Sequence, residues 1–315
     1  MTALRVTRWG SVLLVSLLVV VLWRPVASSP LRTIALGTAP WQLAVNQRAH
    51  RAFIYTATQR GNTVSVLDTA SGALLHTVQV GGTLLFDSNE LQFGVARLLA
   101  VDEQTQRVFV EGQRSDGQGQ VSVLDARSGA LLRTIVLGPH LNQTGAIGVD
   151  ERTQRVFVLG QGLDGRGKVS VLEARSGRLL RTLSVGAHPV AVAVNRQTSR
   201  VLVSALGPTN SAGEVTSDGN VSVLDEHTLA VRRTLTVGAA PADLAVDEPS
   251  GHTLVINSNY NPSDCSLAFV QVPEAGWVQG LRWLQQRLGW LPLRAPQPPA
   301  PITHGSVMLL TSAHE

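Results

Sequence analysis

Two histidines at equivalent positions of a repeated pattern are the first side chains in this sequence that could do chemistry. His140 follows LRTIVLGP and His188 follows LRTLSVGA, and the corresponding stretch of the first repeat carries Asp87 and Glu90. Imidazole nitrogens and carboxylates bind ligands and metal ions and transfer protons, so these four residues are the candidate ligand-binding group. Alternatively, the imidazoles only line a polar funnel, because no local spacing holds the four residues together.

Other chemical motifs are weak. Each of three hairpins carries one Asp-Gly pair, which is typical of a tight turn rather than of the several oxygens that calcium needs. The pairs are Asp116-Gly117, Asp164-Gly165 and Asp218-Gly219. The sequence predicts no catalytic residue, no metal site and no cofactor. A lyase or hydrolase built on the histidine and carboxylate group is the alternative.

A tryptophan-rich segment near the C-terminus is predicted to form an amphipathic helix over residues 274–291. Its apolar residues follow the alternating steps of four and three expected of one helical face. They are Trp277, Leu281, Leu284, Leu288 and Leu291. Trp283 and Trp290 lie off this stripe beside Arg282 and Arg287. The helix either lies buried across the domain or contacts a partner or a membrane surface.

The elements that must position these residues follow from a repeat of about 50 residues. VSVLDARSGALLRTIVLG, residues Val121 to Gly138, has three further copies, which begin at Val64, Val169 and Val221. Each copy reads as two strands joined by a turn, and in the copy from Val121 this turn ends at Gly129. A repeat of this length built from short strands is typical of a β-propeller.

Counting the strands of each type predicts an all-β fold, a single propeller of five four-stranded blades. Besides the VSVL and LRT strands, each repeat has an LAV-like strand, such as Leu99 to Val101, and a third apolar strand, such as Arg107 to Glu111. Leu31 to Leu36 is expected to pair with Ser306 to Leu310, so that the N- and C-terminal strands close the ring. Residues 259–304 are then an insertion in the last blade, made of the helix and a proline-rich return.

The sequence resembles the bacterial YVTN-type β-propeller repeat family. VSVLDTASG, VSVLDARSG and VGAHPVAVAVN carry the resemblance, whereas the family's Tyr-Val-Thr-Asn tetrapeptide is degraded to Tyr55-Thr56-Ala57-Thr58. The resemblance implies a propeller, and it implies binding rather than a particular chemistry.

Residues 1–28 are expected to form a signal peptide or an N-terminal membrane anchor. Arg5 and Arg8 precede an uncharged apolar run from Trp9 to Trp23, which places the domain of residues 29–315 outside the cytoplasm. Lys and Arg number 26 and Asp and Glu 22, without a dense basic block, so no nucleic-acid partner is expected. The single Cys265 excludes an intramolecular disulfide.

The connections between strands predict which end of the propeller binds. The turns after the LAV strands are short, and their arginines are expected to pair with neighbouring carboxylates. The arginines are Arg48, Arg51, Arg107, Arg152, Arg155, Arg196 and Arg200. All longer connections fall at the opposite end. We therefore expect a non-catalytic propeller that binds a protein or small ligand there; a structural module of the cell surface is a further alternative.

Overall fold

The computed structural model describes residues 40–58, 61–81, 97–138, 143–210, 215–257 and 266–271, together with residues 34 and 36. The chain divides into two units, Met1–Ala35 and Leu36–Glu315, and all but one of these residues belong to the second unit. Within the described ranges, no helix is long and apolar enough to cross a membrane.

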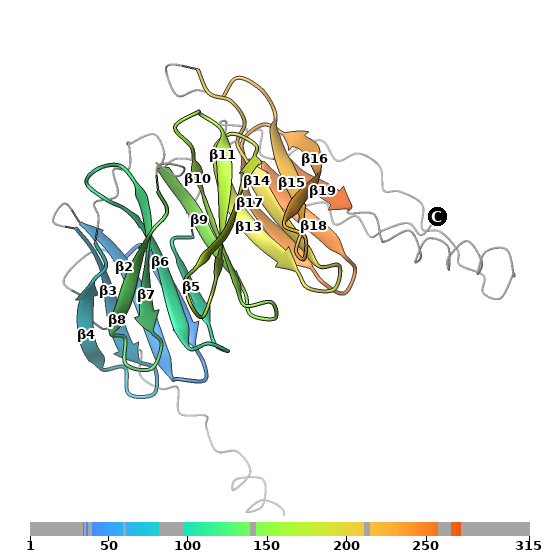
Figure 1. The fold of residues 1–315 in the computed structure, drawn as a ribbon. Helices are drawn as coiled ribbons and strands as arrows, with labels where there is room; N and C mark the ends of the chain where they lie inside the picture. Colours follow the sequence, from blue (N-terminus) through green and yellow to red (C-terminus); the bar gives the residue numbers. More distant parts are fainter. Residues whose placement is uncertain are drawn as a thin grey trace, which may run out of the picture. The chain divides into compact units, whose positions relative to one another are not determined.

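The described residues form nineteen strands in five antiparallel sheets (Figure 1). Sheet 1 contains β1 (Gln42–Asn46), β2 (Arg51–Thr58), β3 (Gly61–Asp68) and β4 (Leu74–Gln79). Sheet 2 contains β5 (Leu99–Asp102), β6 (Arg107–Gln113), β7 (Gly119–Asp125) and β8 (Leu131–Val136). Sheet 3 contains β9 (Gln143–Asp150), β10 (Arg155–Gln161), β11 (Gly167–Glu173) and β12 (Leu179–Val185). Sheet 4 contains β13 (Pro189–Asn195), β14 (Arg200–Ala205), β15 (Gly219–Asp225) and β16 (Ala230–Gly238). Sheet 5 contains β17 (Pro241–Asp247), β18 (His252–Asn257) and β19 (Ser266–Gln271).

Turn chemistry explains the hairpins that the repeat predicts. In sheet 2 the Asp125 carboxylate accepts hydrogen bonds from the N–H groups of Arg127 at 3.1 Å and Ser128 at 2.9 Å. Gly129 then takes a φ of 74°, in the left-handed region that glycine tolerates best. Asp68 and Asp225 make the equivalent bonds, so the Asp residues that end β3, β7 and β15 all begin turns of the same kind.

The core lies between successive sheets. Alternate residues of each strand point to opposite faces, so the two valines of a VSVL strand pack toward the following sheet and its leucine packs toward the preceding one, as Val121, Val123 and Leu124 do. The first residue of each later LAV-like strand packs toward the preceding sheet, as Leu99, Ile147 and Leu244 do. Burying one such side chain stabilises the fold by about 1.5–3 kcal/mol. Apolar contact therefore joins the five sheets in chain order.

The last sheet differs from the sequence prediction. Its third strand is β19, which pairs with β18 from Asn257↔Ser266 to His252↔Gln271. Ser306 to Leu310 was expected at this place, and β19 falls within residues 259–304, which were predicted to be an insertion. SLAFVQ contains a short unbroken apolar run, Leu267 to Val270, which suits a strand, and it lies closer in sequence to β18. Residues 306–310 and the helix expected at residues 274–291 lie outside the described residues.

The outer faces of the first and last sheets remain uncovered by the other described sheets. Leu43 of β1 is 59% exposed, although its equivalent Leu99 is only 4% exposed, and Ile256 of β18 is 50% exposed. The described sheets therefore form an open series, and the predicted closure of the ring and the count of five blades stay predictions.

Candidate functional site

The short-turn end, where the first strand of each sheet turns into the second and the third into the fourth, carries repeated ion pairs. Arg51 pairs with Asp68 at 2.6 Å, and the equivalent pairs are Arg107–Asp125 at 3.4 Å and Arg200–Asp225 at 2.7 Å. Each pair joins the start of the second strand to the end of the third. The expectation that these arginines neutralise neighbouring carboxylates is confirmed for the three sheets.

Sheet 3 lacks the corresponding pair. Arg155 lies opposite Glu173 in the β10–β11 register, but no ion pair joins them, and Arg155 Nη1 has no hydrogen-bond partner among the described residues. The longer carboxylate of Glu173 accepts a hydrogen bond from the Ser176 hydroxyl instead. One additional methylene group thus takes the carboxylate away from the arginine.

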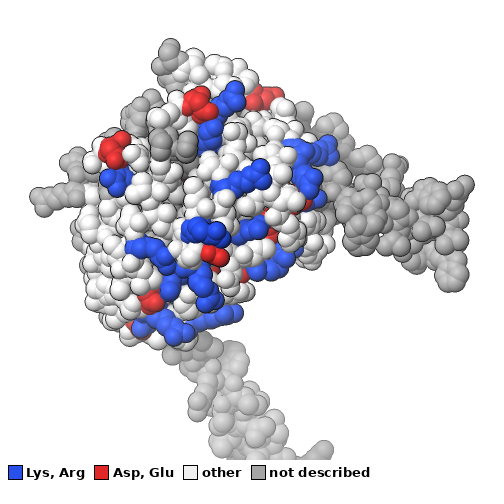
Figure 2. Space-filling model, viewed as in Figure 1, with Lys and Arg blue, Asp and Glu red and all other residues white. Residues whose placement is uncertain are grey.

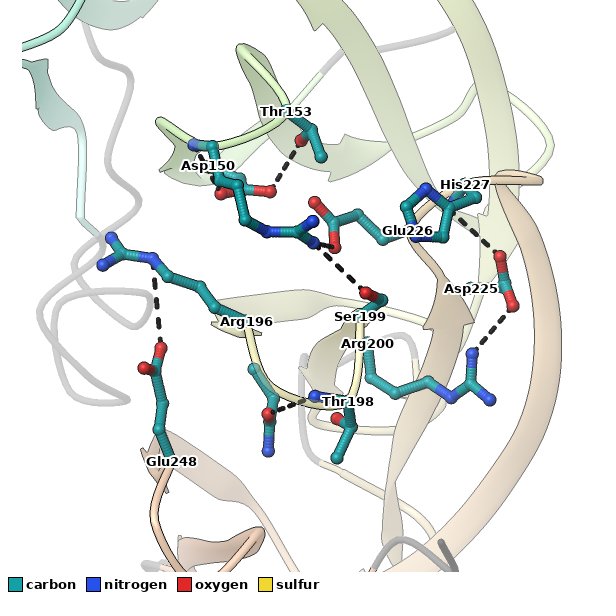
Figure 3. Close-up of polar contacts among 12 residues, drawn as sticks. Asp150, Thr153, Arg196, Thr198, Ser199, Arg200, Asp225, Glu226, His227 and Glu248 are labelled. Atoms are coloured by element: carbon teal, nitrogen blue, oxygen red, sulfur yellow. Dashed lines mark hydrogen bonds and ion pairs between the residues drawn. The ribbon is translucent and has the colours of Figure 1, made fainter. Parts of the chain in front are cut away.

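Further carboxylates at the short-turn end link one sheet to the next. Glu103 of sheet 2 accepts a hydrogen bond from the Gln47 N–H at 2.6 Å, and Glu151 of sheet 3 accepts one from the Glu103 N–H at 2.7 Å. Arg196 and Glu248 approach to 3.9 Å between sheets 4 and 5 (Figure 3). This part of the short-turn end holds the sheets together.

The most unusual cluster at this end lies between sheets 3 and 4, where Asp150 and Glu226 meet (Figure 3). Asp150 ends β9 and accepts hydrogen bonds from the Thr153 hydroxyl at 2.6 Å and from the Arg152 N–H at 3.0 Å. Glu226 follows β15, and its fully buried side chain pairs with the Arg152 guanidinium, which also donates to Ser199 Oγ at 3.2 Å. Glu226 thus pairs with the side chain of Arg152, whereas Asp150 binds the backbone N–H of the same residue.

Burial, followed by the neighbouring Asp150 carboxyl, raises the pKa of Glu226 to about 7. Burial also acts to raise the pKa of Asp150, but the interactions with Glu226, Thr153 and Arg152 outweigh it and hold that pKa below its usual value. The pair therefore holds one proton, mainly on Glu226, below about pH 7.

Sequence reasoning missed this pair, although a signal exists. Glu226 directly follows the VSVLD segment, where the other copies carry Thr69, Ala126 and Ala174. Ala126 and Ala174 are buried in the apolar layers between sheets. A glutamate at a position that elsewhere holds a buried alanine must find a polar partner or remain protonated. Because its side chain is closed to solvent, the pair holds a proton but cannot reach a substrate.

A second buried carboxyl, that of Glu111, lies toward the opposite end of sheet 2. Neither its two oxygens nor the hydroxyl of the buried Tyr55 has a hydrogen-bond partner among the described residues. Burial raises the pKa of Glu111 well above its usual value, against a smaller opposing effect of the Gly145 N–H. Burial, and then the charge of Glu111, raises the pKa of Tyr55. Burial therefore favours the neutral form of both groups.

His188 is the one residue of the sequence-predicted ligand group that the structure describes. It lies between β12 and β13 with a φ of 53°, and its N–H donates to Gln161 Oε1 at 3.0 Å. Its Nδ1 lies 3.1 Å from the Gly207 carbonyl oxygen and its Nε2 lies 3.3 Å from Gln161 Nε2. The ring thus ties the ends of β10 and β14 together, and a ligand would have to replace one of these contacts.

The other predicted site residues lie outside the described residues, so the structure brings none of them together. They are His140, Asp87 and Glu90 of the ligand group, and Trp277, Trp283, Trp290, Arg282 and Arg287 of the expected helix. Among the described residues no group of three or more His, Cys, Asp or Glu side chains could hold a metal ion.

Comparison with known proteins identifies the fold. No family model and no curated protein matches the chain. A chain of the Kuenenia stuttgartiensis hydrazine synthase is similar in structure, with a TM-score of 0.57 and 14% identity over 79% of this chain and 66% of that one. The Dos1 propeller has a TM-score of 0.50 and 14% identity over 73% of this chain and 58% of its own. A chain of the mitotic checkpoint complex has a TM-score of 0.53 and 14% identity over 76% and 65% of the two chains.

These similarities show the fold alone, because the sequences are only 14% identical. The chain spans between 58% and 66% of the length of these three chains. Together with the repeated four-stranded sheets, they establish an all-β repeat protein of the β-propeller class.

Proposed function

We propose that this protein is a non-catalytic, extracytoplasmic β-propeller that binds a protein or small ligand at its long-loop end. This end is the one opposite the short turns, where the second strand of each sheet turns into the third. The proposal rests on the variation in the length of the connections, which is confined to this end. The β10–β11 connection is short, the β14–β15 connection runs from Leu206 to Asp218, and the short-turn hairpins keep nearly constant lengths. Length variation on a constant scaffold is typical of a binding surface.

Exposed apolar side chains at the same end also support binding. Leu163, in the β10–β11 connection, is 70% exposed, and Trp41, just before β1, is also exposed. Large exposed apolar side chains next to variable loops favour contact with a partner. The propellers to which this chain is similar add a precedent, since one belongs to the mitotic checkpoint complex.

The proposal includes a closed ring of five blades, in which Leu31 to Leu36 complete the last sheet and this sheet packs on sheet 1, so that the exposed faces of β1 and β18 cover each other. It also includes membership of the YVTN-type repeat family and export by residues 1–28 as a signal peptide or anchor. The repeated VSVL segments and the basic, apolar N-terminus support these two points. The mass of the mature chain distinguishes cleavage after residue 28 from a retained anchor.

Site-specific photocrosslinking tests which end binds. A photoreactive amino acid replaces Leu163 at the long-loop end or, as a matched exposed control, Arg48 at the short-turn end, and the protein is irradiated in its native cells. We expect an adduct of discrete mass from position 163 and none from position 48. Adducts from position 48 alone, or the same adducts from both positions, would contradict the proposed binding end.

A further inference from the structure

A band of arginines covers the outer strands of sheets 2, 3 and 4 and the turns that precede them. We call this surface the rim patch. It consists of the exposed residues Arg127, Arg133, Arg175, Arg178, Arg181, Arg232 and Arg233. Figure 2 shows that cationic side chains gather on this side of the molecule, with few carboxylates between them.

The rim patch is continuous from sheet to sheet. The Arg133 guanidinium of β8 donates to the Arg175 carbonyl oxygen at 3.0 Å and to that of Ser176, both in the turn before β12. Arg181 of β12 donates to the Thr228 carbonyl oxygen at 3.1 Å, in the turn before β16. Each turn therefore lies against the outer strand of the preceding sheet, and the arginines of the three sheets form one surface.

The carboxylates of the same hairpins neutralise only one residue of this surface, Arg232. Asp125 is engaged by Arg107 and Asp225 by Arg200 and Arg232, whereas Glu173 is engaged by Ser176. Within the part of the chain that the structure describes, Arg232 is the one rim arginine with an ion pair, and Arg133 and Arg181 donate to backbone carbonyl oxygens, so four rim arginines have neither kind of contact. They are Arg127, Arg175, Arg178 and Arg233.

Protection of sheet edges explains only part of the rim patch. β8, β12 and β16 are the edge strands of their sheets, and a charged side chain on an edge strand prevents pairing with another chain. That role fits Arg133, Arg181 and Arg233. It does not explain Arg127 and Arg175, which lie in turns and have no backbone ladder to protect.

Apolar side chains lie between the arginines and indicate the kind of partner. Leu131, Leu132, Leu179 and Val231 are each between 38% and 44% exposed. Arginines beside exposed aliphatic side chains are typical of surfaces that lie at the boundary between headgroups and acyl chains. An acidic protein segment would match the charges of the arginines, but it would not offer these aliphatic side chains an apolar environment such as the acyl chains provide.

We propose that the rim patch docks on an anionic lipid surface, with its free arginines on headgroup phosphates and its leucines at the headgroup boundary. Juxtamembrane cations are attracted to anionic lipids within about a Debye length, and the attraction weakens as salt increases. The rim patch is separate from the long-loop end, so this inference goes beyond the proposed function and does not depend on it.

Vesicle binding with hydrogen exchange tests the proposal on the full chain. The vesicles contain phosphatidylcholine alone or with about one third phosphatidylglycerol, enough to give a negative surface potential. The apolar N-terminal run can bind either vesicle, so the measurement is the change that phosphatidylglycerol causes. We expect peptides covering β8, β12 and residues 174–178 to become protected only on anionic vesicles.

Matched variants locate the charge effect. Arg175→Glu/Arg178→Glu should abolish the phosphatidylglycerol-dependent protection and weaken the affinity for anionic vesicles at least about tenfold. Arg114→Glu/Arg166→Glu makes the same change of net charge at the long-loop end and should behave as the unaltered protein. Thermal unfolding checks that both variants fold.

Two results would overturn the proposal. One is anionic-vesicle protection that persists in Arg175→Glu/Arg178→Glu or that is lost equally in the control variant. The other is protection of the same peptides by poly-L-glutamate but not by phosphatidylglycerol vesicles, which would assign the rim patch to an acidic protein instead.

Discussion

At the scale of single residues, Glu226 makes the stability of the fold depend on pH. Its pKa is about 7 in the folded chain and about 4.5 in the unfolded chain. Folding therefore gains from the bound proton fully below about pH 4.5, and this gain is lost as pH rises through 7. From pH 5 to pH 8 the loss is about 2 kcal/mol, since one pKa unit corresponds to about 1.4 kcal/mol.

Glu226→Gln should remove this dependence, because glutamine does not ionise. Urea unfolding gives the free energies of unfolding of the unaltered protein and the variant, and the difference between the two proteins should change between pH 5 and pH 8.

Arg152→Met should have the opposite effect on the pKa of Glu226. Without the guanidinium, the pH at which the stabilisation by the Glu226 proton is half lost should move above 7. An identical pH profile for the unaltered protein and Glu226→Gln would show that Glu226 is already ionised at pH 5.

Among the elements, the β11–β12 hairpin lacks the turn hydrogen bonds and the ion pair that the equivalent hairpins share. Asp125 and Asp225 each bind a turn and an arginine, whereas Glu173 binds only the Ser176 hydroxyl. Glu173→Asp should restore the turn bonds and the pair with Arg155, and so stabilise the protein by about 1 kcal/mol. Thermal unfolding should show a Tm higher by about 2 °C. The reverse change, Asp125→Glu, should lower the Tm; no change in either variant would contradict this role of the side-chain length.

For the molecule as a whole, substitutions on the exposed face of β1 test whether the ring of sheets is closed. Leu99→Ala should cost about 2–5 kcal/mol, because Leu99 is buried against sheet 1. If the last sheet covers β1, Leu43→Ala should cost a similar amount, and this is the result we expect. Urea unfolding measures both, with the exposed Leu163→Ala as the control. A neutral Leu43→Ala would mean that the ring stays open at this face.

The strands of the repeat and their hairpins follow directly from the amino-acid sequence. Periods of two in segments such as VSVL and LAV, and Asp and Gly at fixed turn positions, act within a few residues of one another, so they can be read directly from the sequence. The pairing of Arg51 with Asp68 also follows from the register of neighbouring strands, which the repeat preserves.

Which sheets meet, and which side chains they bring together, depends on tertiary packing. Arg152 and Glu226 are 74 residues apart, and their contact depends on the packing of sheet 3 on sheet 4. The choice of β19 as the partner of β18 depends in the same way on which of two similar apolar segments reaches that edge. Such contacts arise from the fit of whole faces, which strand periodicity does not encode.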